Sequence, residues 1–194
     1  MMHRRRIPIG IVLAVGLALA VIIFLRPWKL RSDETRNLES VLVFADPSQC
    51  RTAEPLTRIA QALRDFEYRA GGERTGPSIS LPGFPEPLRP HRIRSFGIGR
   101  DAMGFGTMAE LEIRGRWHGL NVVALRSTSG DNPEILFSDR PEHVRQTLSR
   151  AGFPLPAVDQ WQQPDYSSTS PAPMTSVQSR RDGASFYCEP VVIP

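Results

Sequence analysis

The stretch TMAELEIRGRWHGLNVVAL, residues 107–125, decides the fold of this chain. In its first half, small or apolar side chains such as Leu111 and Ile113 alternate with charged ones. This period of two is typical of a β-strand with one buried face and one wet face. Residues 120–125 are apolar on both parities, which predicts a strand covered on both faces. We therefore expect an antiparallel hairpin with its tip at residues 117–119.

The residues before this hairpin predict a further strand at 91–98. The glycine-rich segment 97–106, GIGRDAMGFG, joins the two. We expect the strands to pair about residues 103–105, with a β-bulge at Gly97 or Gly99 restoring the phase. The segment matches a phosphate-binding loop only loosely, because a strand follows it instead of a helix. We interpret it as a hairpin connection, with anion binding as the alternative.

Arginines alternate along both of these expected strands. They are Arg92 and Arg94 on the first, and Arg114 and Arg116 on the second. Pairing about residues 103–105 would bring all four together, and like charges facing one another across strands destabilise a sheet. We predict that these arginines bind an anion or a partner. The alternative is a wet face on which Glu110 and Glu112 neutralise them.

A helix is expected between Pro55 and the Gly71-Gly72 pair. Its apolar residues fall on one arc at helical spacing: Leu56, Ile59, Ala60, Leu63, Phe66 and Ala70. Glu67 lies within that arc, either as a desolvated functional acid or as an edge residue whose carboxylate reaches water.

A short strand at 135–137 precedes a second expected helix. Asp139 and Glu142 have the spacing of a capping box, and Val144, Leu148 and Ala151 form an apolar stripe. Gly152, with Pro154 after it, ends the helix.

The remaining segments complete the expected domain. Residues 40–45 predict a buried first strand, and residues 184–193 a last strand that pairs with it. The proline-rich residues 71–90 predict a long surface loop, and the Ser/Pro/Gln-rich residues 162–183 a mobile segment. Residues 40–194 are therefore predicted to form one α+β domain with a mostly antiparallel sheet and two helices.

The chain has two cysteines, Cys50 and Cys188, near the two ends of this domain. In an oxidising compartment we expect them to form a disulfide that joins the first and last elements. The alternative is that both are unpaired and buried.

Residues 7–25, IPIGIVLAVGLALAVIIFL, contain no charge, amide or hydroxyl. As a helix they would be about as long as the hydrocarbon core of a bilayer is thick. Ala20 ends a small-x-small sequence, so cleavage of a signal peptide after it is the alternative to an uncleaved anchor. We favour the anchor, because apolar residues continue to Leu25 and Trp28 then suits the membrane interface. Residues 26–39 are interpreted as a tether.

The basic residues 1–6 favour a cytoplasmic N-terminus, with the domain on the periplasmic or extracellular side of the inner (plasma) membrane. Arginines and a lysine also follow the apolar stretch, so the opposite orientation stays open. The net charge of +4 comes mostly from the N-terminus, and we therefore expect no nucleic-acid binding.

No motif for a nucleophile, a metal site or a cofactor is present in the sequence. His118, at the expected hairpin tip, is the best candidate for a general base, although a solvated turn residue is the simpler reading. We expect a membrane-anchored, non-catalytic envelope domain that binds a protein or an envelope component. An envelope hydrolase with its site near His118, or an immunity or inhibitor protein, is the alternative.

Overall fold

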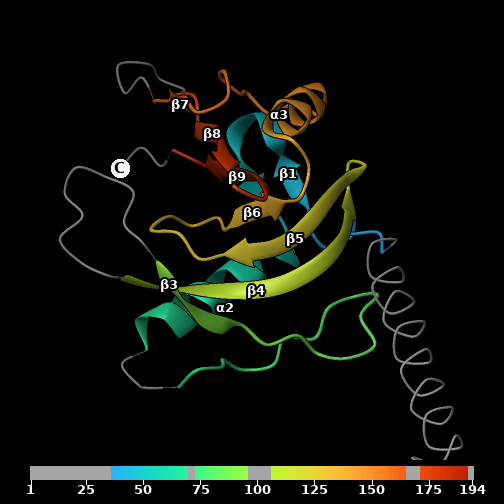
Figure 1. Cartoon of the computed structure of the whole chain (residues 1–194), viewed down its shortest axis with the longest axis vertical. Helices are drawn as coiled ribbons and strands as arrows, with labels where there is room; N and C mark the ends of the chain where they lie inside the picture. Colours follow the sequence, from blue (N-terminus) through green and yellow to red (C-terminus); the bar gives the residue numbers. More distant parts are fainter. Residues whose placement is uncertain (1–35, 70–72, 96–105, 165–170, 192–194) are drawn as a thin grey trace, which may run out of the picture. The chain divides into compact units, whose positions relative to one another are not determined.

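The computed structural model describes residues 36–69, 73–95, 106–164 and 171–191. Its largest element is a seven-stranded sheet in the order β3-β4-β5-β6-β9-β8-β7, in which every pair of neighbours is antiparallel (Figure 1). The strands are β3 (His91–Ser95), β4 (Gly106–Trp117), β5 (Leu120–Arg126), β6 (Glu134–Phe137), β7 (Trp161–Gln162), β8 (Met174–Arg180) and β9 (Gly183–Glu189).

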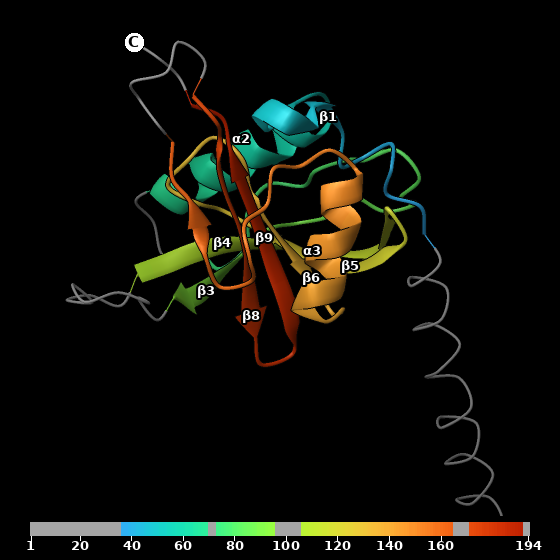
Figure 2. The ribbon, with the colours of Figure 1, turned by 90° about the horizontal axis from the view of Figure 1, so that it is seen from above.

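Two helices pack on the sheet. Helix α2 (Leu56–Tyr68) contacts β4, and α3 (Pro141–Arg150) contacts β8 and β9 (Figures 1 and 2). Most of the buried residues of both helices belong to one hydrophobic core, together with most of the buried apolar residues of the strands. The predicted α+β domain with a mostly antiparallel sheet and two helices is confirmed.

The β4–β5 hairpin forms as the alternation predicts. Along β4 the odd-numbered residues from Ala109 to Trp117 are buried, whereas Glu112, Arg114 and Arg116 are exposed. The turn residues His118 and Gly119 have φ angles of 50° and 78°. Positive φ at both central residues is the geometry of a type I′ turn, which matches the twist of the flanking strands.

Aromatic rings fill the centre of the core. Trp117 is 1% exposed and lies within 6.3 Å, centroid to centroid, of Phe44, Phe137, Phe153 and Phe186. Since Phe153 lies three residues after the end of α3, this cluster holds the end of α3 against the strands. The face of the sheet that carries the even-numbered side chains of β4 is therefore the face directed away from the helices.

The disulfide between Cys50 and Cys188 is present, with its Cα atoms 5.4 Å apart. It joins β9 to the residue that follows the short 3-10 helix η1 (Pro47–Gln49). The predicted bond is confirmed, and it closes a loop across 138 residues of sequence.

The expected first strand at 40–45 is wrong. Residues 39–42 form a turn and bend, and only β1 (Phe44–Asp46) is extended. It pairs with β2 (Arg51–Thr52) outside the main sheet, while β9 pairs with β6 and β8. The apolar side chains of Val41 and Leu42 are buried in the core from a turn, and such burial requires no extended backbone.

The mobile segment expected at 162–183 is also wrong over 174–183, where the chain forms β8 and the start of β9. Thr175 and Ser176 are fully buried in β8 despite their polarity. The backbone of β8 pairs with β9 along its whole length, from Met174 to Arg180. This pairing and the buried Val177 stabilise a strand that composition alone had counted as polar.

The predicted capping box of the second helix does not form. The N-cap of α3 is Arg140, without a side-chain hydrogen bond, and Asp139 accepts hydrogen bonds from the backbone and side chain of Asn121. Asp139 thus ties the start of α3 to β5. In the proline-rich segment, residues 73–90 form no helix or strand, as expected, but Ile79 and Leu81 are buried in the core.

Several predictions lie outside the described residues. These are the cytoplasmic residues 1–6, the anchor at 7–25, most of the tether (26–35), and the glycine-rich connection with its bulge at Gly97 or Gly99. Within the residues described, no helix is both long and apolar enough to span a bilayer.

Candidate functional site

A groove of about 390 Å³ lies on the sheet face directed away from the helices. Its walls come from β3 and β4 on one side and from the turn between β8 and β9 on the other. The lining residues are His91, Glu110, Glu112, Arg114, Val123, Ala124, Arg126, Leu136, Phe137, Ser138, Arg180 and Asp182. Most of the wall residues are charged, and those of the floor on β5 and β6 are mostly apolar.

The floor is apolar because β5 and β6 carry small or aliphatic residues on both faces. Ala124 pairs with Glu112 on one side and with Leu136 on the other. These two apolar side chains are buried, and their neighbour Val123 is partly exposed. The register is irregular between Val122 and Ala124, so Val123 and Ala124 both reach the groove.

At one end of the groove, three adjacent strands hold an ion cluster. Glu110 lies opposite His91 on β3 and opposite Arg126 on β5. Its Oε2 atom accepts a 2.6 Å hydrogen bond from Nε of Arg126, and its Oε1 atom lies 3.5 Å from Nε2 of His91. The Arg126 and Glu110 side chains are both largely shielded from water. The pair therefore forms a shielded part of the wall.

Two further arginines stand at the rims. Nη2 of Arg114 donates a 2.8 Å hydrogen bond to Oε1 of Glu112, two residues away on the same strand. Across the groove, Nε of Arg180 lies 3.8 Å from Oδ1 of Asp182, which is too long for a hydrogen bond. Both acids are mostly exposed to water.

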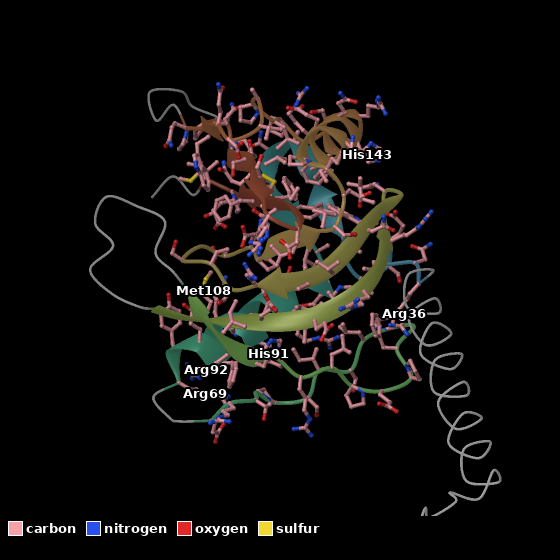
Figure 3. All side chains as sticks on the ribbon, viewed as in Figure 1. Arg36, Arg69, His91, Arg92, Met108 and His143 are labelled. Carbon is pink, nitrogen blue, oxygen red and sulfur yellow. A yellow bond between two sulfur atoms is a disulfide. The ribbon has the colours of Figure 1, made fainter. Side chains whose placement is uncertain are left out.

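Arg92 does not lie in this groove. Its guanidinium lies at the carboxyl end of α2 and donates hydrogen bonds to the carbonyl oxygens of Phe66, Glu67, Arg69 and Glu73 (Figure 3). It therefore satisfies carbonyl groups that the helix itself leaves unpaired.

The four predicted arginines do not form one cluster. In the β3–β4 register Arg92 lies opposite Ala109 and Arg94 opposite Thr107, whereas Arg114 lies beyond the end of β3. The pairing is centred between residues 100 and 101 instead of 103–105. The structure does not describe the side chain of Arg94. Arg116 is exposed, and its backbone pairs with residues 36–38. Of the three whose side chains the structure describes, Arg114 alone is among the groove residues.

The other candidates from the sequence lie elsewhere. At the hairpin tip, the backbone N–H of His118 donates to Oε1 of Glu39, and Nδ1 of His118 lies 3.7 Å from Oε2. Glu67 on α2 has a buried Oε2 atom with no hydrogen-bond partner among the described residues. Those residues also contain no group of three or more His, Cys, Asp or Glu side chains placed to hold a metal.

Sequence reasoning missed Glu110, Arg126, Arg180 and Asp182 as groove residues. Counting back from the two-residue turn of the β4–β5 hairpin would place Glu110 opposite Ser127. The irregularity between Glu112 and Gly115, for which the sequence gives no signal, moves its partner to Arg126. Arg180 and Asp182 carried no signal either, because they belong to a segment whose composition concealed β8.

Comparisons with models of protein families, with curated proteins and with solved structures found no match to this chain.

Proposed function

We propose that this protein is a membrane-anchored binding domain of the cell envelope, and that the groove on the open face of its sheet holds a protein partner. The single observation that carries the proposal is the groove itself, with paired charges on its walls and the apolar residues Ala124 and Leu136 in its floor. Protein-binding surfaces combine an apolar centre with a polar rim in this way.

Two further features support the envelope location. Residues 7–25 are long and apolar enough for a membrane anchor. The Cys50–Cys188 disulfide suits a domain exported to an oxidising compartment. In this proposal the N-terminus is cytoplasmic and the domain faces the periplasm or the cell exterior.

Photocrosslinking in intact cells tests the proposal. A photoreactive amino acid at Val123, in the groove floor, should give a discrete crosslinked protein, whereas the same group at the exposed Gln61 on α2 should not. Equal products from both positions, or none from Val123, would contradict a binding role for the groove.

A second experiment tests the orientation in the membrane. Protease added to spheroplasts should digest the domain, and full protection would contradict the proposed orientation.

A further inference from the structure

We propose that the open face of the sheet carries a second contact for a protein partner, outside the groove: a site for an arginine side chain. It is formed by the rings of Trp161 and Tyr187 and by the carboxylates of Glu134 and Glu189. We call these four residues the acidic aromatic patch. The inference adds to the proposed function, because the patch lies on the same face as the groove.

The strand register places the two rings next to each other on that face. Trp161 on β7 lies opposite Ser176 on β8, which lies opposite Tyr187 on β9. Phe186 and Cys188 on either side of Tyr187 are buried in the core, so Tyr187 is directed to the open face. The rings meet edge to face with their centroids 5.3 Å apart, and Trp161 is 46% exposed. An exposed tryptophan ring is a surface that attracts a cation over its face.

Glu134 on β6 lies between these rings and the end of the groove. The β6–β9 ladder, continued by one residue from Ile135, places Glu134 beside Tyr187. On its other side Glu134 lies opposite Arg126, whose guanidinium is paired with Glu110. Within the part of the chain that the structure describes, Glu134 forms no ion pair of its own. Its carboxylate is therefore available to a positively charged group.

Glu189 supplies the second carboxylate. Its oxygens accept hydrogen bonds of 2.6 and 3.1 Å from the backbone N–H groups of Asp131 and Asn132. Those donors are neutral and leave the negative charge in place, while Arg64 forms its ion pair with Asp131. Burial and the charge of Glu189 raise the pKa of Tyr187 to about 12, which agrees with a carboxylate close to the phenol.

The patch therefore carries an excess of negative charge, in contrast to the groove. The neighbouring acids Glu110 and Asp131 are each paired with an arginine. Glu134 and Glu189 form no ion pair among the described residues, so their charges are not cancelled. A cationic group of a partner is attracted here, whereas the surface of an anionic membrane is repelled.

The hydroxyl of Ser176 favours arginine over other cations. Ser176 is 0% exposed, and its Oγ atom has no hydrogen-bond partner among the described residues. Buried hydroxyls in native proteins nearly always have a partner, and an N–H group that enters from the open face would provide one. A guanidinium can donate to this hydroxyl and to Glu134 while its plane stacks on Trp161. A quaternary ammonium has no N–H group, and a lysine ammonium has no plane to stack.

Fluorescence polarisation with the full-length protein in detergent micelles tests this inference. The probe is a fluorescein-labelled peptide, Ser-Val-Arg-Val-Ser, and its matched partner carries citrulline, which has a similar shape but no charge, in place of Arg. We expect the Arg peptide to bind about tenfold more tightly, because the charge-assisted hydrogen bonds and the cation–π contact are lost with citrulline. Added salt should weaken the Arg peptide more than the citrulline peptide.

Variants locate the effect. Trp161→Ala and Glu134→Gln should each reduce the preference for Arg severalfold, and the double variant should remove it. Tyr68→Ala, at an exposed aromatic residue of α2, and Glu86→Gln, at an exposed acid of the proline-rich segment, are the matched controls and should change nothing. Thermal unfolding verifies that each variant is folded.

The outcomes separate the inference from the proposed function. Equal binding of the Arg and citrulline peptides, or a preference that survives in the double variant, overturns the arginine site. Tighter binding of an N-acetylglucosamine oligomer than of the Arg peptide, lost in Trp161→Ala, assigns the rings to a glycan and also overturns it. A crosslink from Val123 without any peptide preference retains the proposed function and rejects the arginine site. A preference for Arg without a crosslink from Val123 supports the arginine site and contradicts the groove.

Discussion

The guanidinium of Arg92 lies over the ring of Phe66, 4.8 Å from its centroid, and donates a 2.7 Å hydrogen bond to the Phe66 carbonyl oxygen. One side chain from the edge strand β3 thus covers both the last turn of α2 and its buried aromatic residue. Arg92 is therefore part of the fold, and the candidate groove lies on the other face of the sheet.

Replacing Arg92 by Gln should destabilise the domain by about 2–3 kcal/mol, because carbonyl groups at the end of α2 lose a charged donor. Urea unfolding followed by the fluorescence of buried Trp117 measures the loss. Arg89→Gln, at an exposed position two residues before β3, is the control and should cost little. If Arg92→Gln is as stable as that control, the guanidinium is available for a ligand after all.

The sequence predicts how charged and apolar residues alternate along one strand, but not how two strands are aligned. Alternation predicts which residues share a face of one strand, and it succeeded for β4 from Ala109 to Trp117. Relating two strands requires the register, and the glycine-rich connection gives no local rule for it. The true register places Arg92 opposite Ala109, and so separates Arg92 from Arg114.

Asn132 links the disulfide to the loop before β6. Its buried Nδ2 atom donates 2.7 Å hydrogen bonds to the carbonyl oxygens of both Cys50 and Cys188. We expect Asn132→Ala to cost about 1–3 kcal/mol, since two buried acceptors lose their donor. Urea unfolding of the oxidised protein measures this cost. Replacing both Cys50 and Cys188 by Ser removes the disulfide. This should lower the free energy of unfolding by about 3–5 kcal/mol, as for other disulfides that close long loops.

A double-mutant cycle tests whether the two features act together. If Asn132 stabilises the domain through the bonded geometry of the two cysteines, its replacement should cost less in the protein that lacks the disulfide. Fully additive losses would show that Asn132 acts independently of the bond.

The two segments that were misassigned show why composition could not complete the fold. Ser40–Ala45 is apolar enough for a strand, yet its side chains Val41 and Leu42 are buried in the core from a turn. Strand β8 is polar, yet the hydroxyl of Thr175 donates to the carbonyl oxygen of Pro154, and the backbone pairs with β9. In both cases tertiary partners decide the conformation, and those partners are distant in sequence.

Residues 36–38 pass so close to β4 that a glycine is required at position 115. Residues 36–38 pair with Arg116, and a Cβ atom on Gly115 would lie 2.5 Å from the carbonyl oxygen of Arg36. Gly115→Ala should therefore displace this segment and cost about 1–3 kcal/mol in urea unfolding. Gly119→Asn is the control, because its positive φ suits Asn and the space around it is open. Equal stability of both variants would contradict the close approach.

Tyr187 on β9 should ionise late, because burial and the nearby Glu189 raise its pKa to about 12. Since the unfolded tyrosine ionises near its ordinary value, the folded protein holds the proton longer, and stability falls as the pH rises from that value toward the folded pKa. Absorbance at the tyrosinate band measures the titration. Tyr187→Phe should remove the late step, and a late step that persists would assign it to another tyrosine.

Asp159 protects the open edge of β8. Its backbone N–H donates to the carbonyl oxygen of Val177, and its carboxylate accepts hydrogen bonds from the backbone N–H and the hydroxyl of Ser179. These two hydrogen bonds hold the pKa of the Asp159 carboxyl below its usual value. An exposed strand edge invites pairing with another chain, and Asp159 occupies the groups that such pairing would use.

The stability that Asp159 contributes depends on its ionised form. Above the ordinary pKa of an aspartate the folded and unfolded forms are both ionised, and the contribution is complete. As the pH falls through the lower folded pKa, the proton weakens both hydrogen bonds and the contribution is lost. The difference in unfolding free energy between the natural protein and Asp159→Ala should thus shrink between about pH 5 and about pH 2. Asp65→Asn, at an exposed position on α2, serves as the control. A difference that stays constant over that range would show that the carboxylate of Asp159 does not stabilise the edge.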